Sequence, residues 1–306
     1  MNGLEAFLLT VITASTPLLL AAIGELVVER SGVLNLGVEG MMVMGAVSAF
    51  VAAYATGNPW IGVLAGAAAG ALLSLPFAFL TQTLATNQVA TGLALTLLGL
   101  GLSGLLGEKF VGQPGVPLPK LDIPGLSDIP FIGPVLFGHD VLVYASFAFT
   151  AGVMWFLFRT RAGLVLRAIG VNHTAAHALG YPVVKVRYLA ILFGGALAGL
   201  SGAYLSLSYT PQWIENMTAG RGWIALALVV FATWRPLRVL AGAYLFGAVW
   251  ILGLYVQALG FGLPSQLLTA LPYIVTIVAL VIISRNRTLT LTNTPASIGI
   301  PFVPDR

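Results

Sequence analysis

Long stretches without a charged residue alternate with short polar and basic connections along the chain. The uncharged runs cover residues 6–24, 40–107, 141–158, 188–214 and 239–284. A helix needs about 20 apolar residues to cross a bilayer, so the longest runs each hold several crossings. Because lipid offers no hydrogen-bond partners, the backbone groups must be satisfied within each segment, as they are in a helix. A transmembrane β-barrel would instead show alternating segments of about ten residues. We therefore predict an all-α fold, a polytopic transmembrane helical bundle.

The polar breaks divide the chain into about nine membrane spans, or roughly eight to ten given the uncertainty of segment boundaries. The piece at 222–234 is too short to cross alone, unless it begins in the preceding loop or the bilayer is thin there. We place the spans at 4–27, 33–55, 60–82, 88–107, 141–158, 188–207, 222–234, 239–259 and 267–284.

The basic residues indicate how the spans are oriented, because short cytoplasmic loops carry an excess of Lys and Arg. The loop at 159–187 holds five basic residues and no acid. With nine spans, this loop, the connection at 234–238 and the segment after the last span fall on one side, which we predict to be cytoplasmic. The N-terminus and the loop at 108–140 then lie outside. Residues 1–287 would form the transmembrane domain, and residues 288–306 a cytoplasmic tail.

Composition limits the chemistry that the chain can carry. Of its 306 residues, 58% are hydrophobic and 8% charged, against about 25% charged in a soluble domain. The absence of cysteine excludes disulfides and thiolate chemistry, and the three histidines lie in two loops without a metal-ligand pattern. The isoelectric point near 9.5 could suggest a nucleic-acid partner. The basic residues cluster beside spans, however, where the orientation of the chain in the membrane explains them better. We therefore expect membrane lipid around the chain, and no nucleic-acid partner and no metal site.

One stretch near the start places polar residues inside an apolar region. Asn35 and Glu39 are four residues apart and would share one face of a helix, while three nearby glycines weaken that helix. An acid inside the bilayer costs several kcal/mol unless it faces a partner or a cavity. Three roles are open for Glu39: pairing with Arg30, capping a helix start, or contacting a solute. If the span begins near Val33, Glu39 lies about 9 Å deep, and we expect it to be shallow and partly wet.

The basic loop is longer than a simple connection requires. Within it, Asn172 is suited to be an N-cap, residues 173–180 read as a short Ala-rich helix, and Gly180 suits the position just after its end. A short cytoplasmic helix held between two spans suits docking into a groove on a soluble partner. The alternative is an amphipathic helix lying on anionic lipid.

The loop at 108–140 is rich in proline. Its 110–138 stretch contains six prolines, which exclude a long helix. We predict an irregular segment at the extracytoplasmic mouth of the bundle, which fits a plain connection as well as it fits a docking surface.

Three segments resemble the membrane permease subunits of bacterial ABC importers, in the group that serves sugars, branched-chain amino acids and nucleosides. They read "SGVLNLGVEGMMVMGA" (31–46), "LRAIGVNHTAAHALGYPVVKVRYLA" (166–190) and "AGRGWIALALVVFATWRPLRVLAGAYLFG" (219–247). The first is most similar to the nucleoside branch, which works with basic-membrane-lipoprotein-type binding proteins. The resemblance extends from the second span to the last. It implies a multi-pass protein of the bacterial inner membrane with a cytoplasmic C-terminus.

The resemblance also implies partners and coupling residues. Ala175, Ala176 and Gly180 look like the core of the motif that contacts the ATPase subunit, with Arg167 and Asn172 beside them, although Thr174 stands where the family has an acid. The implied machine contains a second related permease, cytoplasmic ATPase subunits that bind ATP and Mg²⁺, and an extracytoplasmic substrate-binding protein. This chain has no GxxxxGK[ST] phosphate loop, so we expect no cofactor on it and no enzymatic activity.

The implied function is ATP-driven import of a small neutral solute, most similar to nucleoside import, with a sugar as the alternative. A neutral solute needs hydrogen-bond partners and no counter-ion, so the expected pathway residues are Asn35, Glu39, Asn87 and Gln88. Asn87 and Gln88 fit equally well as polar turn residues at the membrane surface. From a different class, an ion-coupled secondary transporter would show carboxylates at the membrane midplane and would need no docking helix.

Overall fold

Helices account for almost all the regular structure of the chain. The computed structural model describes residues 3–121, 125, 129–130, 132–258, 264–284 and 293–303. Over these residues it contains no strand beyond one isolated bridge between Lys120 and Asp140, which confirms the all-α bundle. The elements are α1 (Gly3–Arg30), α2 (Val38–Thr56), α3 (Pro59–Ala78), η1 (Phe79–Thr83), α4 (Gln88–Gly107), η2 (Glu108–Phe110), α5 (Ile132–Phe137), α6 (Val141–Arg159), α7 (Arg161–Val171), α8 (His173–Ala178), α9 (Val183–Tyr204), η3 (Leu205–Tyr209), α10 (Arg221–Phe231), α11 (Pro236–Ala258) and α12 (Ser265–Ser284).

Seven of the described helices are long and apolar enough to cross a membrane. They are α1, α2, α3 continued by η1, α4 continued by η2, α6, α9 continued by η3, and α11. α10 has 11 residues, so it extends over about 16 Å of a hydrocarbon core that is about 30 Å thick. The predicted count of nine spans is therefore not confirmed, although each expected span coincides with a helix.

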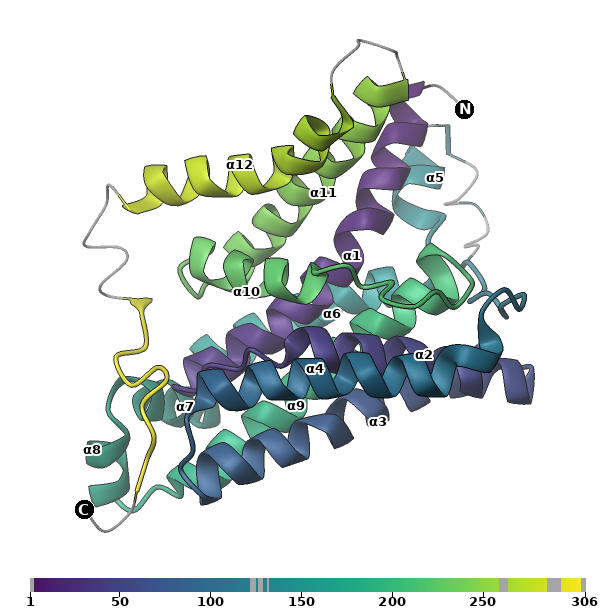
Figure 1. The fold of residues 1–306 in the computed structure, drawn as a ribbon. Helices are drawn as coiled ribbons and strands as arrows, with labels where there is room; N and C mark the ends of the chain where they lie inside the picture. Colours follow the sequence, from purple (N-terminus) through teal and green to yellow (C-terminus); the bar gives the residue numbers. More distant parts are fainter. Residues whose placement is uncertain are drawn as a thin grey trace.

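The bundle has two ends, which we name after the short helices that mark them. α7 and α8 follow α6 at one end, the α8 end, where residues 293–303 also lie (Figure 1). α5 precedes α6 at the opposite end, the α5 end. Helices α2, α3, α4 and α9 run side by side between the two ends, and α1 crosses behind them toward α7 (Figure 1).

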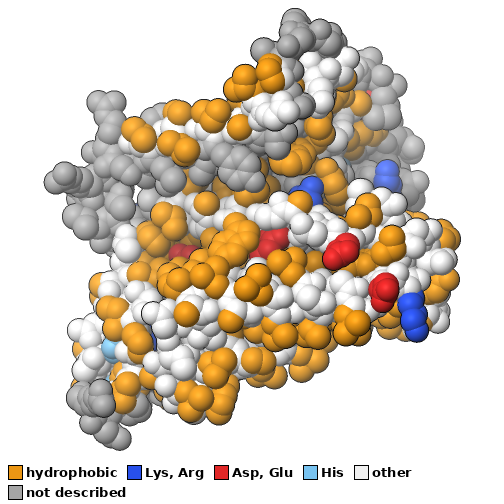
Figure 2. Space-filling view, in the orientation of Figure 1, with side chains coloured by type: hydrophobic (Ala, Val, Ile, Leu, Met, Phe, Trp, Pro, Cys, Tyr) orange, Lys and Arg blue, Asp and Glu red, His pale blue; other side chains and the backbone are white. Residues whose placement is uncertain are grey.

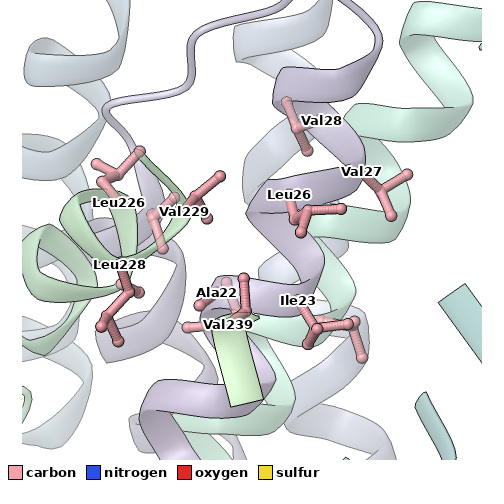
Figure 3. Packing of buried hydrophobic residues seen from close by; sticks show 14 of the residues in the cluster. Ala22, Ile23, Leu26, Val27, Val28, Leu226, Leu228, Val229 and Val239 are labelled. Atoms are coloured by element: carbon pink, nitrogen blue, oxygen red, sulfur yellow. The ribbon is translucent and has the colours of Figure 1, made fainter. Parts of the chain in front are cut away.

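α1 passes through the centre of the bundle. Every residue from 14 to 30 is buried, as expected for a largely apolar helix that is enclosed by other helices. Ala22 and Leu26 of α1 share one apolar cluster with Val229 of α10 and Val239 of α11 (Figure 3). The short helix α10 is therefore anchored on α1 through its apolar face.

Glycines allow α2, α3 and α9 to approach one another closely. A Cβ atom added at Gly45 or Gly70 would lie within 3.0 Å of the backbone of Gly199. Close contact between small residues replaces hydrophobic burial as the force that joins helices in lipid. The small-residue runs at 62–79 in α3 and 193–207 in α9 and η3 thus supply closely packed helix contacts.

A side chain at Gly199 should separate these helices. Its Cβ would meet backbone atoms of Gly66 and Gly70, so Gly199→Ala should cost about 1–3 kcal/mol of overpacking. We expect a lower thermal unfolding temperature in detergent, measured by fluorescence-detected size exclusion. Gly152→Ala is the control, since no atom of the described part of the chain lies within 4 Å of its added Cβ. Equal unfolding temperatures for the two variants would contradict the packing argument.

The two long loops differ in how much helix they contain. The loop at 159–187 holds α8, as expected, and also α7, which was not predicted. The proline-rich loop is irregular over residues 111–121, and the six-residue helix α5 follows among its described residues. Parts of the predicted regions lie outside the described residues: 122–124, 126–128 and 131 in this loop, and 288–292 and 304–306 in the predicted tail.

Candidate functional site

Two non-helical segments enter the bundle from opposite ends and meet inside it. The first segment, residues 31–37, connects α1 with α2 and enters from the α8 end. The second segment, residues 210–220, connects η3 with α10 and enters from the α5 end. Both segments run alongside α4, so the α4 residues that each segment contacts show how far it reaches into the bundle.

The first segment runs along the first half of α4. The amide of Leu34 donates to Oε1 of Gln88, the first residue of α4, at 2.8 Å. The carbonyl of Leu36 accepts a hydrogen bond of 2.9 Å from the hydroxyl of Thr96. Gln88 and Thr96 are eight positions apart, which corresponds to about 12 Å along the helix. α2 therefore begins well inside the bundle and not at its end.

The second segment descends along the other half of α4. The carbonyl of Pro211 accepts a hydrogen bond of 3.2 Å from Gly115 at the α5 end. The indole of Trp213 packs on Gly107, the last residue of α4, and Glu215 lies beside Gly104. Beyond Glu215 the chain reaches the start of α2.

Glu39 joins the two segments where they meet. Its Oε1 accepts hydrogen bonds from Oγ1 of Thr218 at 2.5 Å and from the amide of Gly220 at 2.8 Å. Its Oε2 accepts one from the amide of Gly222 at 2.6 Å. Gly220 is the N-cap of α10 and has a φ of 83°, a conformation that glycine adopts without strain. The carboxylate thus satisfies backbone amides at a helix start, where the helix dipole also favours negative charge.

This geometry corrects the expected position of Glu39. The side chain is 3% exposed, and the adjacent Gly40 packs on Leu95 and Thr96 near the middle of α4, so it is neither shallow nor partly wet. The prediction failed because the chain stays non-helical as far as Gly37, and an extended residue advances about 3.3 Å instead of 1.5 Å.

Of the roles considered for Glu39, the structure contains the capping of a helix start. The helix is α10, which lies about 180 positions later in the chain. Arg30 does not pair with Glu39, because its guanidinium donates to the carbonyls of Trp234 and Asn293.

The other three residues expected on a solute pathway bind the backbone of this chain. The buried Asn35 accepts a hydrogen bond of 2.9 Å from the amide of Gly37. Asn87 is exposed and caps α4 by accepting from the amide of Ala90 at 3.0 Å. Gln88 is 2% exposed, and its Nε2 has no hydrogen-bond partner among the residues that the structure describes. Asn35 thus lies in the first segment, Gln88 binds that segment from α4, and Glu39 follows it at the start of α2. Asn87 lies next to Gln88 at the α8 end.

Two further acids lie buried in α1 and contact the same region. Oε1 of Glu25 accepts a hydrogen bond of 3.3 Å from the amide of Asn35. Oε2 of Glu29 accepts one of 2.5 Å from the indole of Trp234, in the turn between α10 and α11. These acids fix the first segment and the end of α10 to α1. Sequence reasoning gave them no role, although their spacing of four, directly after the uncharged run at 6–24, was a usable signal.

Arg187 connects the first segment with α8. It is fully buried at the start of α9, where its Nε donates to the carbonyl of Ser31 at 3.1 Å. Its Nη2 lies 3.3 Å from Nδ1 of His173, the first residue of α8. The sequence identified Arg187 only as a signal of orientation. In the structure it is the side chain through which α8 touches the segment that leads to Glu39.

The short helix in the basic loop forms as predicted. Oδ1 of Asn172 caps α8 by accepting a hydrogen bond of 2.9 Å from the amide of Ala175. Gly180 follows the helix with a φ of 87°, the left-handed conformation expected just after a helix end. Asn172 and Gly180 therefore have the capping roles that the sequence indicated.

The remaining residues expected to couple to an ATPase differ in exposure. Ala175 and Gly180 are exposed, while Ala176 is 4% exposed and packs in a cluster with Ile169 and Val183. The guanidinium of Arg167 lies 5.0 Å from the ring centre of Phe158, an attractive cation–π geometry. Ala176 thus faces the interior of its own chain, and Ala175 faces outward.

His173 should make the α8 end sensitive to acid. Burial and the nearby positive charge of Arg187 lower the pKa of His173 below its usual value, so its neutral ring accepts the hydrogen bond from Arg187. The unfolded chain then binds the proton more readily, and stability falls as the pH drops below the usual histidine pKa of about 6.5.

We expect the unfolding temperature to fall between about pH 7.5 and 5.5, and to fall less in His173→Asn. Thermal unfolding across this range measures the effect. His177→Asn is the matched control, because His177 is exposed one turn further along α8. The same pH dependence in all three proteins would refute a role for His173.

Comparisons with known proteins agree with this architecture. Residues 7–283 match the family model described as branched-chain amino acid transport system / permease component. The chain is 41% identical to the putative glucose ABC transporter permease protein TsgC13 of Haloferax volcanii, over 82% of this chain and 78% of that one. It is 33% identical to the guanosine ABC transporter permease protein NupQ of Bacillus subtilis, over 94% and 93% of the two chains.

A third relative is the nucleoside ABC transporter permease protein NupC of Lactococcus lactis, 32% identical over 91% of this chain and 92% of that one. The family model covers nearly the whole helical bundle, including both non-helical segments and α8. The chain therefore belongs to the family of branched-chain amino acid transport system permease components, the membrane permeases of ABC transporters.

Proposed function

We propose that the chain is the membrane-spanning subunit of an ATP-driven importer of nucleosides. Relatives named for guanosine and nucleoside transport align over more than nine-tenths of this chain, and the motif at 31–46 is of the nucleoside type. A sugar is the second candidate, because the relative named for glucose is the more identical one at 41%. The protein would act in the multi-pass inner membrane of a bacterium, with its C-terminus in the cytoplasm.

The observation that carries the proposal is the exposed, non-helical second segment. Gln212, Glu215 and Asn216 are exposed along it, yet it lies beside α4, which has the length and composition of a membrane span. Lipid does not tolerate free backbone and charged groups at such depth, but a polar cavity or a partner protein does. We therefore place the solute pathway on this face, where acidic side chains are visible between the apolar ones (Figure 2).

Asn35, Glu39, Asn87 and Gln88 would border this pathway. Three of them hold the first segment and the start of α10 in place, so they would shape the pathway through the backbone that they fix. Gln88 does so from inside the bundle, because its side chain is 2% exposed and its Oε1 accepts a hydrogen bond from the amide of Leu34.

Coupling to ATP would run from α8 to the pathway. ATP and Mg²⁺ would bind to a separate cytoplasmic ATPase subunit, which docks on α8 and its neighbours Arg167, Asn172, Ala175, Ala176 and Gly180. A displacement of α8 would act on Ser31 through Arg187, and then on Glu39 and α10 through the first segment. Trp234, in the turn after α10, donates a hydrogen bond to Glu29 of α1. This contact holds the C-terminal end of α10, so a shift of its N-terminus would tilt the helix about that end.

A second permease and an extracytoplasmic substrate-binding protein complete the proposed transporter. A second permease is supported by two further relatives, the glucose permease TsgB13 of Haloferax volcanii at 26% identity and the guanosine permease NupP of Bacillus subtilis at 24%. Each comes from an organism that also has one of the more similar relatives described above.

Uptake by cells with and without this chain tests the proposal. We expect loss of the chain to abolish uptake of labelled guanosine and to leave uptake of labelled glucose unchanged. Loss of glucose uptake alone would replace the nucleoside by a sugar. Guanosine uptake that survives ATP depletion but stops with a protonophore would instead identify an ion-coupled secondary transporter.

A further inference from the structure

Residues 297–303 near the C-terminus are built into the α8 end. The amide of Ser297 donates to the carbonyl of Gly170 at 2.9 Å, and the amide of Gly299 donates to the carbonyl of Gly32 at 3.2 Å. The carbonyl of Ile300 accepts a hydrogen bond of 3.3 Å from Arg187. This part of the chain is therefore tied to α7, α9 and the first segment at once.

Phe302 extends this attachment to α8 itself. Its ring centre lies 5.3 Å from that of His173 and 5.2 Å from that of His177, with both pairs edge to face. The side chain is 6% exposed and belongs to the same apolar cluster as Ala176. The inner face of α8 thus rests on Phe302, and Arg187 binds both α8 and residue 300.

Large apolar side chains are exposed around this contact. Leu179 just after α8 is 78% exposed, and Ile300 and Val303 on either side of Phe302 are 48% and 43% exposed. Figure 2 shows hydrophobic side chains around a histidine at this end. Apolar side chains that gather at a surface rimmed by polar groups mark interaction sites. In the proposed orientation this end faces the cytoplasm, where exposure to water is unfavourable.

We propose that residues 297–303 and α8 form one composite docking surface for the ATPase subunit, with Ile300 and Val303 contacting that partner alongside Leu179. The inference rests on the proposed function, since it takes α8 as the helix that meets the ATPase. The partner is assigned because the exposed side chains are continuous, through Phe302, with that helix. Phe302 is then a positioning residue that sets the angle of α8.

Charge placed on the exposed side chains tests the surface. We expect Ile300→Glu and Val303→Glu each to reduce, by about tenfold, the amount of ATPase subunit that co-purifies with the chain. This is the loss expected for about 1.4 kcal/mol of binding free energy. Leu179→Glu should do the same, and Leu136→Glu, at an exposed position of α5, should have no effect. The unfolding temperature should be unchanged in all four variants.

The outcomes separate this inference from the proposed function. If only Leu179→Glu weakens co-purification, residues 297–303 do not contact the ATPase, and the inference is overturned while the docking role of α8 stands. If no variant weakens co-purification, α8 is not the docking helix, and both the inference about residues 297–303 and the proposed docking role of α8 fail.

The positioning role of Phe302 has its own measurement. Phe302→Ala should raise the number of ATP molecules hydrolysed per solute imported, and Phe302→Leu should restore most of the coupling because it refills the space beside Ala176. Equal coupling in the native chain and Phe302→Ala would overturn the positioning role.

Discussion

Glu39→Gln should lower uptake by about a hundredfold while the chain still reaches the membrane. The carboxylate accepts three hydrogen bonds, two at Oε1 and one at Oε2. A glutamine keeps one oxygen and turns an NH₂ group toward one or two of these donors. Leaving a buried donor unpaired costs about 1–3 kcal/mol, and about 2.8 kcal/mol corresponds to a hundredfold change in an equilibrium. The start of α10 would then lose its position relative to α2.

Uptake of labelled guanosine, divided by the amount of chain in the membrane, measures the effect. Glu108→Gln is the matched control, because it removes the same charge at an exposed position in η2. Thr218→Val should give a smaller loss, since it removes one donor and leaves the two amide contacts of Glu39 intact. If Glu39→Gln transports as well as Glu108→Gln, the capping of α10 is not required for transport.

The same variants distinguish capping from direct contact with a solute. If Glu39 caps α10, Glu39→Gln lowers the unfolding temperature, and added solute does not restore it. If Glu39 binds the solute, the KM for uptake rises while the unfolding temperature stays close to that of Glu108→Gln. The burial of Glu39 and its three partners within the chain favour the first result.

The helices were predictable from sequence because lipid requires that long apolar runs close their own hydrogen bonds. The same rule does not indicate where those helices are interrupted. Residues 31–37 carry no charge and lead directly into an apolar run, so the predicted span began at residue 33 and not at Val38. What keeps this stretch non-helical is long-range: the side chains of Glu25, Gln88 and Thr96 bind its backbone in place of helical partners.

The candidate site was predictable only where its signals are local. Asn172 and Gly180 bracket α8 within eight residues, and cap chemistry alone indicates their roles. Thr218 lies 179 positions from its partner Glu39, and Ser31 lies 156 positions from its partner Arg187, so a single sequence cannot connect them. The inward direction of Ala176 likewise depends on Phe302, a residue that no periodic pattern links to α8.

Arginine substitutions at Ala175 and Ala176 should both reduce uptake more than tenfold, but through different causes. Ala176 is enclosed by Ile169, Val183 and Phe302, so an arginine there must expel Phe302 or leave a charge buried, at a cost of several kcal/mol. Ala175 is exposed, so an arginine there leaves the packing of the described residues intact and would meet the ATPase subunit that we propose to dock on α8.

The two causes predict opposite signatures in two measurements. Ala176→Arg should lower the unfolding temperature and uncouple ATP hydrolysis from uptake, because α8 loses its support on Phe302. Ala175→Arg should leave the unfolding temperature unchanged and remove the ATPase subunit from the purified complex, while Ala175→Ser, a small change at the same site, retains it. Normal uptake in Ala175→Arg would mean that the outer face of α8 bears no partner. The displacement of Ser31 and Glu39 that we propose would then have to start from a contact outside α8.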